Sequence, residues 1–205
     1  MNHPEQTTQQ RLVQRVYRIQ IVTIVWMLVE AAGSLAAAWM AGSAALLAFG
    51  GDSAIELLSA AIVLWRFRSA AATEHDEQKA ALATGALLIV LTAYIIAISI
   101  LKLIGHGEAA PSYLGIAILS AAAAFMPLLA RTKRKLSTAI GSATLRADAA
   151  ESSVCGYLSL IALTGLVLNA VWGTHWADPA AALAITPLIL REAREALRGK
   201  PCGSS

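Results

Sequence analysis

Five acidic residues fall in stretches of this sequence that are otherwise apolar and long enough to cross a membrane. They are Glu30, Asp52, Glu56, Asp148 and Glu151. An ionised side chain at the centre of a membrane helix costs about 2.5 to 3.5 kcal/mol. The only basic residue expected at comparable depth is Arg146, which is near enough to a helix end to reach the surface. Either protons or a bound cation must therefore neutralise the carboxylates.

The spacing of these residues predicts a metal site. Asp52 and Glu56 are four residues apart, as are Glu151 and Cys155, so each pair lies on one helical face. With a rise of about 1.5 Å per residue, Asp52 and Glu151 each lie roughly 14 Å in from the start of their own spans, which enter from opposite faces of the membrane. Both are therefore near the middle of a hydrocarbon core about 30 Å thick. Three carboxylates and one thiolate suit tetrahedral Zn²⁺, and the sulfur also admits Cd²⁺.

Three further interpretations stay open for single residues. Glu30, alone on its span, could be a metal ligand or a structural hydrogen-bond partner, and Asp148 could be a ligand or could orient its neighbours. Cys155 by itself would usually be a small buried apolar residue.

Composition and hydropathy indicate the elements that position these residues. The chain has 205 residues, of which 57% are hydrophobic and 14% charged. Apolar stretches suited to membrane helices cover residues 19–41, 44–66, 80–104, 112–130 and 143–172. A sixth, 176–191, is shorter, with Asp178 expected as its N-cap before Pro179. We therefore expect an all-α membrane protein with six transmembrane helices.

Charge sets the expected topology and domain limits. Basic residues gather near both termini and after the second and fourth spans, whereas the opposite side has only Lys102. The positive-inside rule then places both termini in the cytoplasm. We expect a cytoplasmic segment at 1–18, a transport domain at 19–192 in the lipid bilayer, and a short cytoplasmic tail at 193–205. Basic residues beside spans do not indicate a nucleic-acid partner.

A weak internal repeat relates the second and fifth spans at an offset of 99 residues. Residues 42–56 read GSAALLAFGGDSAIE and residues 141–155 read GSATLRADAAESSVC, which superposes Asp52 on Glu151 and Glu56 on Cys155. The two spans run in opposite directions, so the repeat would be inverted, as in many transporters. The alternative is a chance alignment of small residues, which are common in membrane helices.

The segments GDSAIELLSAAIVLWRF and ADAAESSVCGYLSL resemble the two metal-site helices of the cation diffusion facilitator family. The resemblance covers residues 15–195 and implies a homodimeric exchanger of divalent metal ions for protons, with no enzymatic activity and no bound cofactor. It places the metal on Asp52, Glu56, Glu151 and Cys155, where Glu151 and Cys155 depart from the usual His and Asp. We expect a short branch without a C-terminal metal-binding domain, in the inner (plasma) membrane of a bacterium.

Two other functions fit parts of the sequence. An intramembrane lipid phosphotransferase could hold Mg²⁺ on acidic residues, although such sites usually lie near the headgroups. A proton-coupled carrier of organic cations needs one buried acid and an aromatic cage, and no cage surrounds Glu56 or Glu151.

Overall fold

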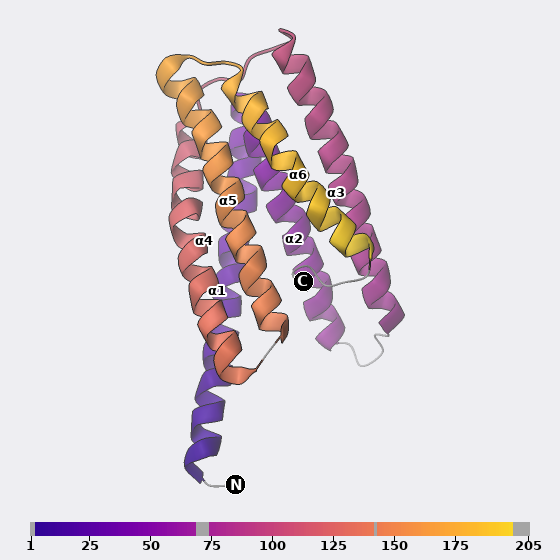
Figure 1. Ribbon diagram of the computed structural model, residues 1–205, viewed down its shortest axis with the longest axis vertical. Helices are drawn as coiled ribbons and strands as arrows, with labels where there is room; N and C mark the ends of the chain where they lie inside the picture. The colour runs from indigo at the N-terminus through magenta and orange to yellow at the C-terminus, as the bar shows by residue number, and fades with distance from the viewer. Residues whose placement is uncertain (1–2, 69–73, 142, 199–205) are drawn as a thin grey trace.

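The computed structural model describes residues 3–68, 74–141 and 143–198, and within them the chain forms six α-helices (Figure 1). Successive helices run in opposite directions along one bundle. The helices are α1 (His3–Ala41), α2 (Ala44–Arg68), α3 (Glu74–Leu103), α4 (Tyr113–Ile140), α5 (Ala143–Trp172) and α6 (Ala177–Leu197). The expected all-helical membrane bundle is confirmed. Residues 199–205 of the expected tail, with Cys202, lie outside the described residues.

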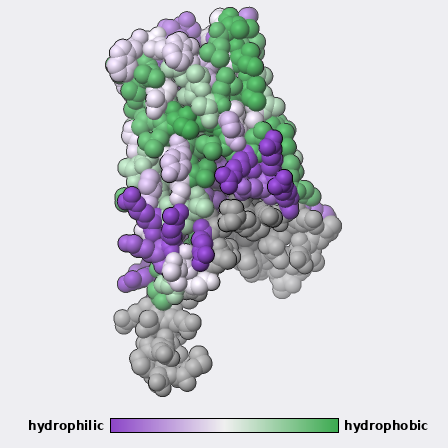
Figure 2. Space-filling model, viewed as in Figure 1, coloured by the Kyte–Doolittle hydropathy of each residue, from purple (hydrophilic) through white to green (hydrophobic). Residues whose placement is uncertain are grey.

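Length and apolar composition are sufficient for membrane crossing in four helices of the described chain. The qualifying segments are Gln14–Ala41, Ala81–Leu103, Tyr113–Ala139 and Asp148–Trp172. Large apolar side chains such as Trp39, Val90 and Val171 are exposed, as expected for a surface that faces lipid. On the face drawn in Figure 2, the described hydrophilic residues gather toward the lower end, below a mostly apolar region. Helices α2 and α6 complete the bundle.

Two helices extend further than the hydropathy indicated. Helix α1 begins at His3, and α4 continues to Ile140, so the loop expected after residue 130 is helical instead. The segment from Arg131 to Ile140 is polar but contains good helix formers, and polarity alone does not end a helix. Helix α4 ends where Gly141 takes a positive φ of 68° and donates its N–H to Ser137 O.

The internal repeat corresponds to equivalent places in the fold. Gly42 follows α1 with a φ of 60°, and Gly141, its counterpart in the repeat, follows α4 with a φ of 68°. Both glycines therefore allow a sharp turn into the next helix, in a conformation that other residues rarely adopt. Helices α2 and α5, which contain the two copies, run in opposite directions (Figure 1).

Asp178 has a different role from the one expected. Helix α6 begins at Ala177, with Trp176 in the N-cap position and no side-chain cap. The Asp178 carboxylate instead accepts the Ser43 hydroxyl and, at 2.8 Å, the backbone N–H of Ala44. The N-cap prediction for α6 was thus wrong, because this buried carboxylate satisfies donors at the start of α2, where a negative charge also complements the helix dipole.

Small residues let the helices approach closely. A Cβ atom on Gly165 of α5 would lie 2.5 Å from Ala181 Cβ and 3.0 Å from Ala177 O, both on α6. Such contacts are typical of membrane helices, which associate through packing because lipid offers no hydrophobic driving force between them. Helix α6 also packs against α3 and α2, which brings its inner face to the centre of the bundle.

Candidate metal site

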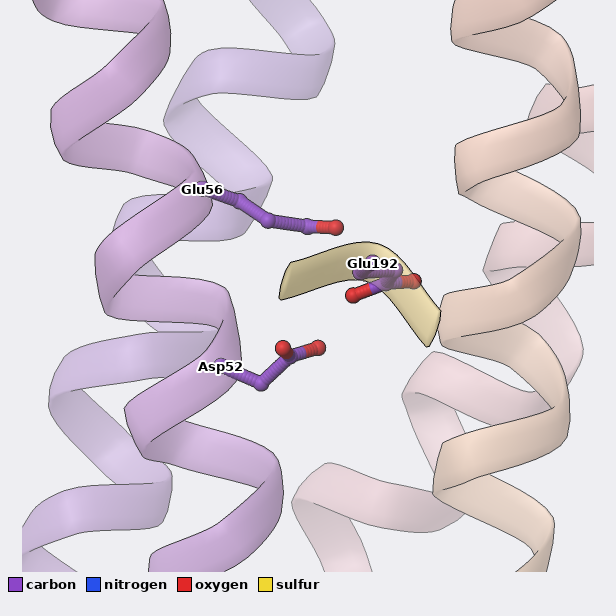
Figure 3. Close-up of side chains that lie close together, drawn as sticks. All are labelled: Asp52, Glu56 and Glu192. Atoms are coloured by element: carbon purple, nitrogen blue, oxygen red, sulfur yellow. The ribbon is translucent and has the colours of Figure 1, made fainter. Parts of the chain in front are cut away.

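Helices α2 and α6 bring three carboxylates together inside the bundle. Asp52 and Glu56 extend from successive turns of α2, and Glu192 of α6 lies between them (Figure 3). One oxygen from each carboxylate lies within 4.8 Å of the other two. Asp52 and Glu192 are also within hydrogen-bonding reach of each other.

We call Asp52, Glu56 and Glu192 the carboxylate cluster. No described basic side chain neutralises its negative charge. Asp52 is 1% exposed and Glu192 8%, while Glu56 is partly buried. Asp52 Oδ1 and Glu192 Oε2 are buried and have no hydrogen-bond partner among the described residues. In the same part of the chain no basic side chain forms an ion pair with any of the three. Buried carboxylates in this state need protons or a cation.

Sequence reasoning missed Glu192. The predicted sixth span ends at residue 191, and residues 191–197, REAREAL, have the composition of a solvated, charged helix end. A signal was present nonetheless: Ile185, Ile189, Glu192 and Ala196 follow one another at helical spacing, and all four are buried. A glutamate in the apolar stripe of a membrane helix is a candidate functional residue.

The structure separates the four ligands that the sequence grouped. Glu151 of α5 is close enough for its charge to act on Glu56 and Glu192. It does not belong to the group of described residues whose ligand atoms lie within 4.8 Å of one another. Cys155, one turn further along α5, is 3% exposed and contacts Glu30 of α1.

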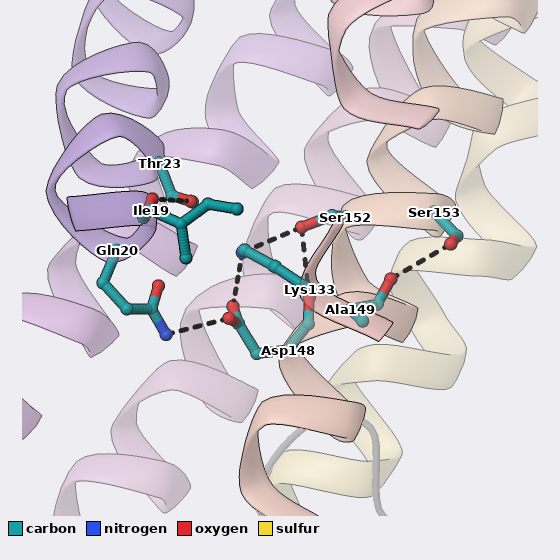
Figure 4. Close-up of polar contacts among 8 residues, drawn as sticks. All are labelled: Ile19, Gln20, Thr23, Lys133, Asp148, Ala149, Ser152 and Ser153. Carbon is teal, nitrogen blue, oxygen red and sulfur yellow. Dashed lines mark hydrogen bonds and ion pairs between the residues drawn. The ribbon is translucent and has the colours of Figure 1, made fainter. Parts of the chain in front are cut away.

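Asp148 lies in a separate polar cluster between α1, α4 and α5 (Figure 4). Its carboxylate accepts Lys133 Nζ at 2.8 Å and Gln20 Nε2 at 2.9 Å, and Lys133 Nζ also donates to Ser152 Oγ at 3.0 Å. Lys133 is fully buried, so the expectation that Arg146 was the only basic residue at depth was wrong. This pairing favours the structural interpretation of Asp148.

The carboxylate cluster offers three oxygen ligands to a divalent cation. Oxygen ligands lie about 2.0 to 2.2 Å from Zn²⁺, so in tetrahedral geometry two of them are about 3.3 to 3.6 Å apart. The ligand atoms of the cluster, which lie within 4.8 Å of one another, would have to close by up to about 1.5 Å around an ion. They come from two helices and lie beside Glu151, which can complete the negative charge of the site.

Fold and side chains together define a class: an integral membrane protein with a cluster of acidic residues inside a helical bundle. Residues 20–199 match the cation efflux transmembrane domain, and the chain belongs to the cation efflux family. The protein is therefore a cation transporter, and this membership supports the expectation that it is not an enzyme. No curated protein matches the chain.

Proposed function

We propose that this protein exports a divalent metal ion across the membrane in exchange for protons. The observation that carries the proposal is the carboxylate cluster of Asp52, Glu56 and Glu192, whose ligand atoms lie within 4.8 Å of one another. The cluster is drawn from two helices and has no basic partner among the described residues. A divalent cation would supply the positive charge that neutralises these carboxylates.

Proton exchange follows from the same crowding. Glu151 and Glu56 interact electrostatically, as do Glu151 and Glu192, so four carboxylates share one region of the bundle. Several adjacent carboxylates cannot all remain ionised in a medium of low dielectric constant. When the ion leaves, protons must replace it, and when an ion enters, they must depart. Metal flux in one direction thus requires proton flux in the other.

Ligand chemistry supports Zn²⁺ and softer ions such as Cd²⁺ as cargo. The carboxylate cluster alone would also accept harder ions, because carboxylates suit Mn²⁺ and Mg²⁺. The thiol of Cys155 experiences the charges of Glu30, Glu56 and Asp52, so it lies near the route of the ion. A thiol at that point favours ions with affinity for sulfur.

Coupling can be measured in proteoliposomes that contain a metal-sensitive dye and a pH dye. We expect Zn²⁺ uptake to acidify the medium that the ion leaves. An imposed proton gradient should drive Zn²⁺ toward the acidic side, because protons flow the other way. Zn²⁺, Cd²⁺ and Mn²⁺ should be compared at equal concentration, with protein-free vesicles as the control. Metal flux that ignores a pH step of either sign would refute the exchange.

The proposed topology has both termini in the cytoplasm of a cell whose plasma membrane holds the protein. Thr138, near the end of α4, and Glu108, in the segment between α3 and α4, are both exposed and lie at opposite ends of the bundle. With Cys202 replaced by Ser, Glu108→Cys should react with a membrane-impermeant maleimide in intact cells, and Thr138→Cys only after the membrane is opened. The reverse pattern would invert the topology. The Cys202→Ser protein, which keeps only the buried Cys155, gives the background labelling.

A further inference from the structure

A second pair of metal-ligating side chains meets in the bundle, outside the carboxylate cluster. Glu30 of α1 and Cys155 of α5 are 125 residues apart in the chain, yet Cys155 Sγ lies 3.6 Å from Glu30 Oε1. Glu30 is 1% exposed and Cys155 3%. Neither belongs to the group formed by Asp52, Glu56 and Glu192.

The pair is incompletely satisfied. Glu30 Oε2 is buried and makes no hydrogen bond of ordinary geometry with a described residue, although the Trp26 side chain, whose Nε1 is also unpaired there, is near enough to stabilise the carboxylate. Ser34, one turn further along α1, is fully buried, and its hydroxyl also lacks a partner there. A thiol is a weak hydrogen-bond donor, so its contact with Glu30 Oε1 compensates little of the cost of burying a carboxyl group. The unpartnered carboxylate oxygen and the thiol are thus two adjacent atoms that could serve as metal ligands.

The separation of the two atoms is that of a thiol–carboxylate hydrogen bond, and it also fits a shared metal ion. A zinc ion binds thiolate sulfur at about 2.3 Å and carboxylate oxygen at about 2.0 to 2.2 Å, and tetrahedral angles then place the two ligand atoms about 3.6 Å apart. Cys155 Sγ and Glu30 Oε1 already have that separation, 3.6 Å. An ion could therefore be held by both atoms without movement of α1 relative to α5.

We propose that Glu30 and Cys155 form a second, softer metal subsite, which binds Zn²⁺ or Cd²⁺ through one carboxylate oxygen and one thiolate. The inference rests on the proposed transport of divalent ions. Binding breaks the S–H bond of Cys155, forms the metal–sulfur bond and releases the proton to solvent, with no change of oxidation state. The charges of Asp52, Glu56 and Glu192 act on this thiol, so the subsite adjoins the carboxylate cluster.

Two protein ligands give weaker binding than a full tetrahedral shell, which is useful in a carrier because the ion must leave again. The subsite also differs in softness from the neighbouring cluster of oxygen ligands. Selection among ions of equal charge would then depend on Cys155 and Glu30, while the carboxylate cluster would supply most of the electrostatic attraction.

The subsite can be tested by thiolate-to-metal charge-transfer absorption. In purified full-length protein with Cys202→Ser, Cys155 is the only remaining thiol of the two in the sequence. Titration with Cd²⁺ or Co²⁺ should produce a charge-transfer band. Cys155→Ser should abolish the band, and Glu30→Gln should weaken the affinity seen in the band by about 10-fold or more. Glu192→Gln should change this affinity much less, and Glu195→Gln, at a paired surface glutamate, should leave it unchanged.

Each outcome decides the matter. Absence of the charge-transfer band in the parent protein would overturn the subsite. Loss of the band in Glu192→Gln but not in Glu30→Gln would also overturn it, because the thiol would then belong to the carboxylate cluster. Zn²⁺ transport by the same parent protein in vesicles separates the two proposals. Transport without the band contradicts the subsite only, whereas the band without transport contradicts the proposed function. Size-exclusion profiles identify any variant that fails to fold.

Discussion

Glu192→Gln is expected to reduce metal transport by at least about 100-fold, more than the 10- to 100-fold losses typical of residues that merely support a ligand. The substitution keeps the shape of the side chain but removes a charge from a cluster whose other members, Asp52 and Glu56, come from another helix. Two carboxylates on α2 would remain, and the ion would lose its contact with α6. The rate should be measured as dye-detected Zn²⁺ uptake into vesicles.

A matched control is one turn away on the same helix. Glu195 is 28% exposed and forms an ion pair of 3.0 Å with Arg191. Glu195→Gln makes the same chemical change in α6 but should leave transport within about twofold of the parent, because surface ion pairs contribute little. Equal transport by the two variants would exclude Glu192 from the site.

Lys133→Met is expected to lower the free energy of unfolding by about 3 kcal/mol, the lower end of the range for breaking a buried ion pair. Lys133 is fully buried, and its loss would leave the Asp148 carboxylate with Gln20 as its one remaining hydrogen-bond partner among the described residues. The lower end applies because the Asp148 side chain is 23% exposed and can be partly hydrated. Unfolding in detergent, followed by circular dichroism, measures the change.

The double variant Lys133→Met with Asp148→Asn should recover much of the lost stability, because no uncompensated charge then remains. Lys135→Met, at an exposed position two residues along α4, should have a negligible effect. A loss of stability that is equal at Lys133 and Lys135, or unaffected by Asp148→Asn, would show that the ion pair does not hold these helices together.

Hydropathy was sufficient to predict the bundle, because a membrane requires long apolar helices whose ends are marked by polar residues and turns. Gly42 and Gly141, which begin the two copies of the repeat, both follow a helix end with a positive φ. The acidic pair on α2 could also be predicted as functional, since charge within an apolar run has few structural explanations. These features depend on residues close together in the chain, so they can be predicted from the local sequence.

The remaining features depend on contacts between distant residues. Lys133 looked like one of several basic residues after a span, and only the packing of α4 on α5 reveals that it is buried against Asp148. Asp178 preceded a proline and resembled a cap, but its donors belong to residues 43 and 44. Glu192 follows the apolar stripe of α6 at helical spacing, but only the packing of α6 reveals that it meets Asp52 and Glu56 of α2.

The contact of Asp178 with the start of α2 has a mechanical consequence. It fastens α2 to α6 at one end of the bundle, while Glu192 lies about 21 Å further along α6, at 1.5 Å per residue. As long as that fastening persists, the two helices can separate only by pivoting about it. A tilt of roughly 10° would then move Glu192 away from α2 by roughly 3.5 Å over that lever arm. The ligand atoms lie within 4.8 Å of one another, so this tilt would be enough to separate Glu192 from Asp52 and Glu56 and release a bound ion.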